Sequence, residues 1–255
     1  MHQIIALWSH PRSMSTATER VMRERGDLDC AHEPFMYDYY VHRKAGTMPL
    51  FDVQSDQPTA YADIRDMLLK RAASGPVFFK DMSYYILPYL ADDVEFAARL
   101  TNVFLIRNPV ASIASYYRLD PEVSLEEIGI EAQWQHFEFL EKHGLKSPIV
   151  LKSEDIQNNP ERVMAAFWKA IDLPYRDAFN WSDDTPDDWE QVGGWHGDVS
   201  KSKGIRPMDA DHADKAQARF ETMAEAAPGL YDLLAHHRPF YDLLAARALG
   251  HSDPA

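Results

Sequence analysis

The fold of this chain is decided by one stretch near its start, Ile4-Ile5-Ala6-Leu7-Trp8-Ser9-His10-Pro11-Arg12-Ser13-Met14-Ser15-Thr16. Its opening residues are an apolar run whose length suits a buried parallel strand and is too short for an independent helix. Pro11 ends this run, and from Met14 onward apolar residues recur with the spacing of one helix face. A strand that passes through a short turn into a helix predicts an α/β fold with a parallel sheet.

The turn between this strand and helix is rich in groups that bind anions. Backbone N–H groups at a helix start, together with the positive end of the helix dipole, favour a phosphate or sulfate. Arg12 adds a permanent planar cation. Hydroxyl donors follow it at Ser13, Ser15 and Thr16. One of these serines could simply cap the helix, but the whole combination favours a P-loop-like anion-binding turn.

The familiar nucleotide-binding motifs are missing from this turn. The sequence contains no G-x-x-x-x-G-K-[ST], and no G-x-G-x-x-G follows the first strand. An ATPase ordinarily needs the lysine and the metal-binding hydroxyl of the first motif. The histidines and the acidic run at 183–188 also lack the spacing of metal ligands, so we expect no metal site.

A second strand and turn narrow the choice of anion. Residues 101–106 form another buried-strand run, which ends in Arg107-Asn108-Pro109 before a helix that contains Ser115. Proline suits the first turn of a helix, so Arg107 is expected at the carboxyl end of its strand. Ligands of open α/β sheets collect at these ends.

Together the two segments resemble the sulfotransferases that use 3'-phosphoadenosine-5'-phosphosulfate (PAPS). That family has a Pro-[Lys/Arg]-Ser-Gly-[Thr/Ser]-Thr turn for the 5'-phosphosulfate, and Arg-[Asn/Asp]-Pro with a later Ser-Tyr-Tyr for the 3'-phosphate. Residues 11–16 and 107–117 match both motifs in order and context, and weaker matches lie at 151–174 and 203–204. The resemblance implies a three-layer α/β/α fold with a central parallel sheet, and PAPS as the sulfuryl donor.

The resemblance also implies which residues bind the donor. One group is the anion-binding turn, in which Met14 stands where the family has glycine. A second group holds the 3'-phosphate, and a third belongs to a late loop that closes over the nucleotide. The three groups are Arg12, Ser13, Met14, Ser15 and Thr16; Arg107 and Ser115; and Lys203 and Gly204.

Sulfuryl transfer needs a base for the proton of the acceptor and cations for the SO₃ group in flight. Arg12 and Lys80 are the predicted cations, because both lie at the carboxyl ends of predicted strands. The family's Lys-x-His segment appears here as Lys80-Asp81-Met82, without the histidine base. Bacterial relatives use a glutamate after the second strand, which implies Glu33, although Glu33 could instead be only a salt-bridge partner of Arg12 or Lys80. The alternative bases are His32, Asp81 and His196.

Aromatic residues crowd the segments that follow Glu33 and Lys80. Such a wall suits a small, flat or apolar alcohol better than a charged polysaccharide, although the same rings could be core residues. Tyr116 and Tyr117 are expected to pack a helix against the sheet. The crowded residues are Phe35, Tyr37, Tyr39, Tyr40, Tyr84 and Tyr85.

Composition fits this interpretation. A chain of 255 residues that is 45% hydrophobic can bury one large core, so we expect a single domain over residues 1–255. A net charge of −14 makes nucleic acid and anionic membranes poor partners. The single cysteine, Cys30, favours a reducing compartment. With no leader-like start and no long apolar run, we expect a cytoplasmic protein without a membrane span.

The remaining chain predicts alternating helices and strands. Helical spacing covers 59–74, 122–143 and 160–171, and strand-like runs cover 76–80, 101–106 and 148–152. Residues 180–206 are expected to form an irregular loop that could close on the nucleotide. A helical C-terminal extension over 208–250 could cover the core or form the face of a homodimer.

The sequence therefore predicts an enzyme that moves a sulfuryl group from PAPS to a hydroxyl of a small-molecule acceptor. One alternative is a P-loop-type small-molecule kinase, which the missing Gly-Lys-[Ser/Thr] disfavours. The other is an inactive module that binds PAPS or its product adenosine 3',5'-bisphosphate (PAP) after loss of the base.

Overall fold

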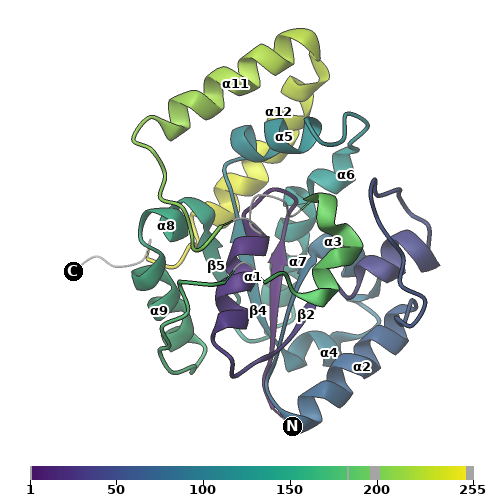
Figure 1. Cartoon of the computed structure of the whole chain (residues 1–255). Helices are drawn as coiled ribbons and strands as arrows, with labels where there is room; N and C mark the ends of the chain where they lie inside the picture. Colours follow the sequence, from purple (N-terminus) through teal and green to yellow (C-terminus); the bar gives the residue numbers. More distant parts are fainter. Residues whose placement is uncertain (1, 183, 196–201, 251–255) are drawn as a thin grey trace.

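Five parallel strands form one central sheet in the computed structural model, which describes residues 2–182, 184–195 and 202–250 (Figure 1). The order of the strands across the sheet is β2-β3-β1-β4-β5, and every neighbouring pair is parallel. This confirms the predicted parallel α/β fold. The strands are β1 (Ile4–Ser9), β2 (Asp29–His32), β3 (Val77–Met82), β4 (Leu100–Ile106) and β5 (Ile149–Lys152).

The apolar run of β1 is buried on both of its faces. Ile4, Ala6 and Trp8 belong to one core cluster, whereas Ile5 and Leu7 belong to the other. Successive side chains of a strand point to opposite sides, so a strand covered on both faces needs a continuous apolar run. The opening stretch of the sequence is apolar for this reason.

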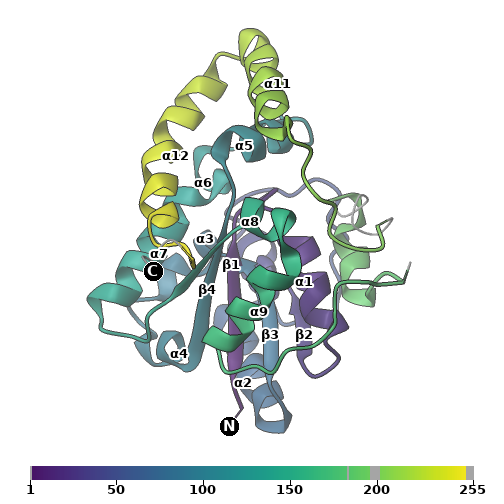
Figure 2. The same cartoon turned by 90° about the vertical axis from the view of Figure 1, so that its left-hand side faces the viewer.

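Helices cover both faces of the sheet and make the outer two layers (Figure 2). Side chains of α1, α8 and α9 fill one core cluster, and those of α2, α4, α5, α7, α11 and α12 contribute to the other. The helices are α1 (Ser15–Glu24), α2 (Tyr61–Ser74), α3 (Ser83–Ile86), α4 (Val94–Arg99), α5 (Pro109–Tyr117), α6 (Leu125–Ile128), α7 (Ile130–Lys142), α8 (Ser153–Asn158), α9 (Pro160–Ala170), α11 (His212–Ala226) and α12 (Gly229–Ala245), with shorter turns η1 (Asp38–His42), η2 (Leu87–Tyr89) and η3 (Asp187–Val192).

The single helix predicted over 122–143 is wrong, because the chain breaks at Gly129 into α6 and α7. Gly129 has a φ of 80°, which L-residues rarely adopt. A Cβ atom there would also lie 3.2 Å from the Cβ of His10 and from the Tyr84 ring. Tertiary packing therefore sets this break, and helical spacing alone does not reveal it.

The two helices predicted at the C-terminal end are present as α11 and α12, which rise beyond the carboxyl ends of the strands (Figure 2). Phe220 of α11 and Leu244 of α12 are fully buried in the core cluster on that side. After α12 the chain returns to the sheet, where the Leu249 amide donates to the Val150 carbonyl at 2.8 Å. The sequence left two roles open for this extension, covering the core or forming the face of a homodimer, and the structure supports the first.

The expectation of a wholly irregular segment over 180–206 is wrong for η3, which is a short 3-10 helix. Trp189 and Val192 of η3 are buried, at 1% and 0% exposure. Two acidic side chains precede Trp189, but the burial of its indole outweighs their preference for water. The segment is therefore docked on the protein over η3.

Candidate active site

The candidate site lies at the carboxyl edge of the sheet, where β1 and β4 are neighbours. The helices that follow these two strands pack on opposite faces, since Val21 of α1 and Ile113 of α5 belong to different core clusters. This makes the β1–β4 edge a topological switch point, the place where open α/β sheets bind ligands.

The anion-binding turn has an unusual backbone. Arg12 and Met14 have φ values of 63° and 70°, and Met14 is in the left-handed conformation immediately before α1. A side chain in this region costs about 1 to 2 kcal/mol relative to glycine. Met14 thus adopts a left-handed backbone that glycine would adopt without this cost.

Buried polar contacts hold the two turns of the site together. His10 donates from Nδ1 to the Pro11 carbonyl at 3.1 Å and accepts the Arg107 amide at Nε2, also at 3.1 Å. Burial lowers the pKa of His10 to about 3, so its imidazole is neutral and can accept this bond. The Ser153 hydroxyl donates to the carbonyls of Ile106 and Ser13. Neither bridge was predicted, because each joins residues far apart in sequence.

A basic cavity lies on the α1 side of the turn, with an empty volume of about 880 Å³, open solvent included. Arg107 reaches it from β4, and its Nη1 donates to the Arg12 carbonyl at 2.9 Å. Burial lowers the pKa of Arg107, so an anion in this cavity would offset the cost of holding that charge away from water. The basic cavity is lined by Arg12, Met14, Ser15, Thr16, Ala17, Arg107, Gln157, Trp195, Ser202, Gly204, Ile205 and Arg206.

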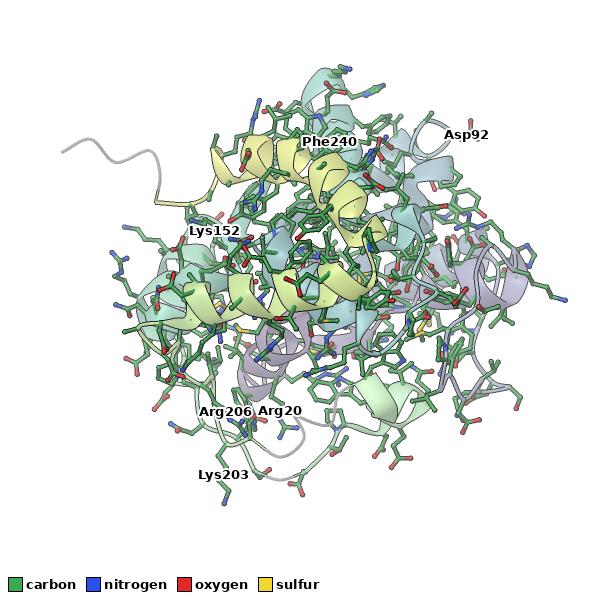
Figure 3. The ribbon with its side chains drawn as sticks, turned by 90° about the horizontal axis from the view of Figure 1, so that it is seen from above. Arg20, Asp92, Lys152, Lys203, Arg206 and Phe240 are labelled. Carbon is green, nitrogen blue, oxygen red and sulfur yellow. The ribbon has the colours of Figure 1, made fainter. Side chains whose placement is uncertain are left out.

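Of the remaining residues predicted to bind PAPS, one lines the basic cavity and the others do not. Gly204 lines the basic cavity, and a Cβ there would come within 2.9 Å of the Phe179 carbonyl oxygen. Lys203 is exposed and points away from the body of the protein (Figure 3). Ser13 is buried and Ser115 accepts a 3.0 Å hydrogen bond from Arg12 Nε, and neither residue lines the basic cavity.

A second, aromatic cavity meets the basic cavity at the turn and has an empty volume of about 530 Å³, open solvent included. The two cavities share Arg12, Ser15, Thr16 and Trp195. A group bound in one can therefore lie next to a group bound in the other. The aromatic cavity is lined by Pro11, Arg12, Ser15, Thr16, Glu33, Tyr40, Thr47, Met48, Pro49, Lys80, Met82, Tyr84, Tyr85, Tyr116 and Trp195.

Glu33 and Lys80 form an ion pair in the aromatic cavity, and both are nearly buried. The Glu33 amide donates to the Lys80 carbonyl at 2.9 Å, which continues the β2–β3 pairing past the end of β2. Glu33 itself has a φ of 42°, so the chain turns at this residue. Glu33 is thus a salt-bridge partner of Lys80 in this structure, and its carboxylate also faces the cavity.

The other predicted bases are less well placed. Asp81 is fully buried, accepts the Phe35 amide at 2.8 Å and lines neither cavity. Burial raises the pKa of Asp81 well above its usual value. His32 lies behind Glu33, with its Nε2 3.9 Å from Glu33 Oε1. His196 lies outside the described residues.

Two aromatic residues of the site have roles that the sequence analysis does not predict. Tyr116 is buried in the core cluster, as expected, but it also lines the aromatic cavity and contacts the Trp195 ring edge-on at 5.6 Å. Trp195 was not singled out, although it is part of both cavities. Its carbonyl accepts from Arg12 Nη1 at 3.2 Å, and its indole donates to the Pro49 carbonyl at 2.8 Å. No local pattern signals this role, because it depends on the docking of η3.

Comparison with known proteins identifies curated relatives for most of the chain. Branched-chain-amino-acid aminotransferase-like proteins 2 and 1 of Arabidopsis thaliana are 22% and 23% identical to it over 246 residues. These residues are 95% of this chain but 41% of each plant protein, so the chain spans about two fifths of the length of these relatives. Their names describe the whole plant proteins.

Solved structures agree on the fold. The sulfotransferase domain of the Synechococcus PCC 7002 olefin synthase superposes with a TM-score of 0.57 at 17% identity, covering 89% of this chain and 95% of that domain. The sulfotransferase domain from the curacin biosynthetic pathway gives a TM-score of 0.53 at 16% identity, covering 89% and 98%. At this identity the likeness shows the fold alone.

The sequence itself decides the family. The family model for the sulfotransferase domain matches residues 2–248, which include both turns of the site and the C-terminal helices. This chain therefore belongs to the sulfotransferase domain family.

Proposed function

We propose that this protein transfers a sulfuryl group from PAPS to a hydroxyl of a small-molecule acceptor. The observation that carries the proposal is the meeting of the basic and aromatic cavities at Arg12, Ser15 and Thr16. A donor anion on one side and an acceptor on the other would then have their reacting atoms at one turn, as group transfer requires.

The basic cavity fits the donor. Its arginines come from the turn after β1, the end of β4 and the late segment, so they can bind phosphates that are far apart on one nucleotide. The open N-terminus of α1 adds backbone donors for the group nearest Arg12. When bound, PAPS supplies the activated sulfuryl group. We propose that Arg12, Ser15 and Thr16 hold the phosphosulfate, and that Arg107 holds the 3'-phosphate.

The aromatic cavity supplies the groups that sulfuryl transfer needs. Lys80 and Arg12 both line it, so both can approach the oxygens on which charge develops during transfer. Glu33 is the proposed base: its carboxylate takes the hydroxyl proton as the acceptor oxygen bonds to sulfur and the bond from sulfur to the 5'-phosphate oxygen breaks. The proton must later leave Glu33 for water to complete a turnover.

The tyrosines of the aromatic cavity favour a small acceptor with an aromatic or apolar body. Burial raises the pKa values of Tyr40, Tyr84, Tyr85 and Tyr116, so their hydroxyls are neutral donors and acceptors around that body. No helix among the described residues is long and apolar enough to cross a membrane. A cytoplasmic location and a homodimer stay predictions from the sequence.

Ligand-dependent unfolding separates this function from its alternatives. PAP without Mg²⁺, at 100 times its Kd, should raise the free energy of unfolding by about 2.7 kcal/mol, and ATP with Mg²⁺ should add little. The reverse result would favour a kinase and refute the proposal. Labelled PAPS is then incubated with a panel of phenols, apolar alcohols and amino alcohols. PAP binding without transfer to any hydroxyl would point to the inactive module.

A further inference from the structure

Behind the Glu33–Lys80 pair lies a network of buried charges that the proposed reaction does not use. Glu19 of α1 is fully buried, although burial of a carboxylate costs several kcal/mol unless it is well paired. Its oxygens accept from Arg23 Nε at 2.8 Å and from Trp189 Nε1 at 2.8 Å, and lie 4.0 Å from Lys80 Nζ. Glu19 is therefore a hydrogen-bond acceptor from several elements at once.

Glu19 also bonds His32, at 2.7 Å from Nδ1 to Oε2. Burial and the charge of Lys80 lower the pKa of His32 well below its usual value, so the imidazole is neutral at pH 7. A neutral imidazole carries one N–H. With Glu19 Oε2 as the acceptor of this bond, the proton of His32 lies on Nδ1 and its Nε2 is an acceptor.

The acceptor side of His32 faces the proposed base. His32 Nε2 lies 3.9 Å from Glu33 Oε1, the same oxygen that the Lys80 ammonium bonds. An acceptor nitrogen beside a carboxyl group favours the protonated carboxyl, which can donate to it, over the carboxylate, which cannot. A proton on Glu33 Oε1 would face Nε2, and a hydrogen bond forms between them once the 3.9 Å separation closes to about 3 Å.

We propose that Glu19 and His32 are positioning residues of this enzyme: Glu19 holds His32 with its proton on Nδ1, so that Nε2 accepts from Glu33 once Glu33 has taken the acceptor's proton. The proposal rests on the proposed function of Glu33. Neither residue touches the substrates. The proton moves from the acceptor hydroxyl to Glu33 and stays there, hydrogen-bonded to His32, until water removes it.

The groups that face His32 and Glu33 come from several elements and all bear on the test. α1 contributes Glu19 and Arg23, β3 contributes Lys80 and Asp81, and η3 contributes Asp188. Asp188 bonds Arg23 at 2.6 Å and accepts the His32 amide at 3.1 Å. Asp188 thus belongs to the same charge network without bonding the imidazole, which makes Asp188→Asn a control for the loss of one negative charge.

The test is Glu19→Gln, read by ¹⁵N NMR of the histidine side chains and by the pH profile of kcat/KM. The glutamine amide can donate to Nδ1, which moves the proton of His32 to Nε2, where it would donate to the Glu33 carboxylate instead. The His32 signals are assigned by their loss in His32→Gln. We expect the Nδ1–H form in the wild type and in Asp188→Asn, and the Nε2–H form in Glu19→Gln.

Activity should follow the position of that proton. Reversing a hydrogen bond to a charged group is worth about 1.5 to 3 kcal/mol. We therefore expect kcat to fall about 10- to 100-fold in Glu19→Gln, and the acidic limb of its pH profile to move about one to two pH units lower, with PAP affinity unchanged. Asp188→Asn should move the limb by much less.

The outcomes are separable. A wild-type His32 with its proton on Nε2, or doubly protonated at pH 7, overturns the proposal. So does a proton that moves to Nε2 in Glu19→Gln while kcat and the acidic limb stay in place, provided that Glu33→Gln is inactive. If Glu33→Gln keeps its turnover, the proposed role of Glu33 fails first, and with it the role of Glu19 and His32 in catalysis.

Discussion

Arg107→Ala should change which nucleotides the protein prefers. Arg107 directly follows β4, lines the basic cavity, and is the residue proposed to bind the 3'-phosphate. PAP has this phosphate and 5'-AMP does not. The variant should therefore weaken the binding of PAP far more than that of 5'-AMP.

The magnitude follows from the environment of the guanidinium. One hydrogen bond from it is already used on the Arg12 carbonyl at 2.9 Å, and its remaining donors can bind a phosphate. A charge-assisted hydrogen bond in such a site is worth about 1.5 to 3 kcal/mol. At about 1.4 kcal/mol per factor of ten, the ratio of PAP to 5'-AMP affinity should fall about 10- to 150-fold.

Isothermal titration calorimetry with both nucleotides measures this ratio. The ratio, and not the PAP affinity alone, is the informative quantity, because loss of the bond to the Arg12 carbonyl can loosen the turn for both ligands. Arg99→Ala is the matched control, since Arg99 is exposed and lies at the opposite edge of the sheet, just before β4. An equal loss of affinity for PAP and 5'-AMP would refute the assignment of Arg107 to the 3'-phosphate.

Two further predictions concern the base and the buried core. Glu33→Gln should lower the single-turnover rate with PAPS by roughly 10²- to 10⁴-fold and leave PAP affinity nearly unchanged; a normal rate would move the role of base to another residue. His136 is fully buried, and burial lowers its pKa from 6.5 to about 3, so the unfolded chain takes up this proton at a higher pH than the folded chain. The contribution of neutral His136 to stability is complete above pH 6.5 and is lost as the pH falls. Between pH 7.5 and 5, the free energy of unfolding of the wild type should therefore fall by about 2 kcal/mol more than that of His136→Gln, as measured by urea denaturation. Equal falls in the two proteins would contradict this prediction.

The parts of the site that lie on continuous segments could be predicted from the sequence. A strand, a turn and a helix follow one another in residues 4–24, and their apolar spacing and turn residues are local signals. The Arg107 turn is local in the same way, with Asn108 as the cap of α5 and proline in its first turn. Parallel strands that end in such turns necessarily bring them to one edge of a sheet.

Residues that enter the site from a distance could not be predicted in this way. Trp195 and Glu19 reach the region of the site because η3 docks on α1. From the sequence alone, Glu19 is expected to be a surface residue of an amphipathic helix. Its burial depends on partners 13 and 170 positions away in sequence. Ser115 is predicted from its motif to bind the 3'-phosphate, and in the structure its hydroxyl accepts a hydrogen bond from Arg12.

The basic cavity has a consequence for how quickly an anionic donor is captured. The chain carries a formal net charge of −14, so the field that a polyphosphorylated nucleotide meets at long range is repulsive. Attraction by the arginines of the cavity begins only within about one Debye length, roughly 8 Å at physiological ionic strength. Added salt screens the distant repulsion and the nearby attraction together, so the association rate should depend weakly on ionic strength. With the proposed donor, selection would then depend on the fit of two phosphates to the arginines of the cavity, and long-range steering would contribute little.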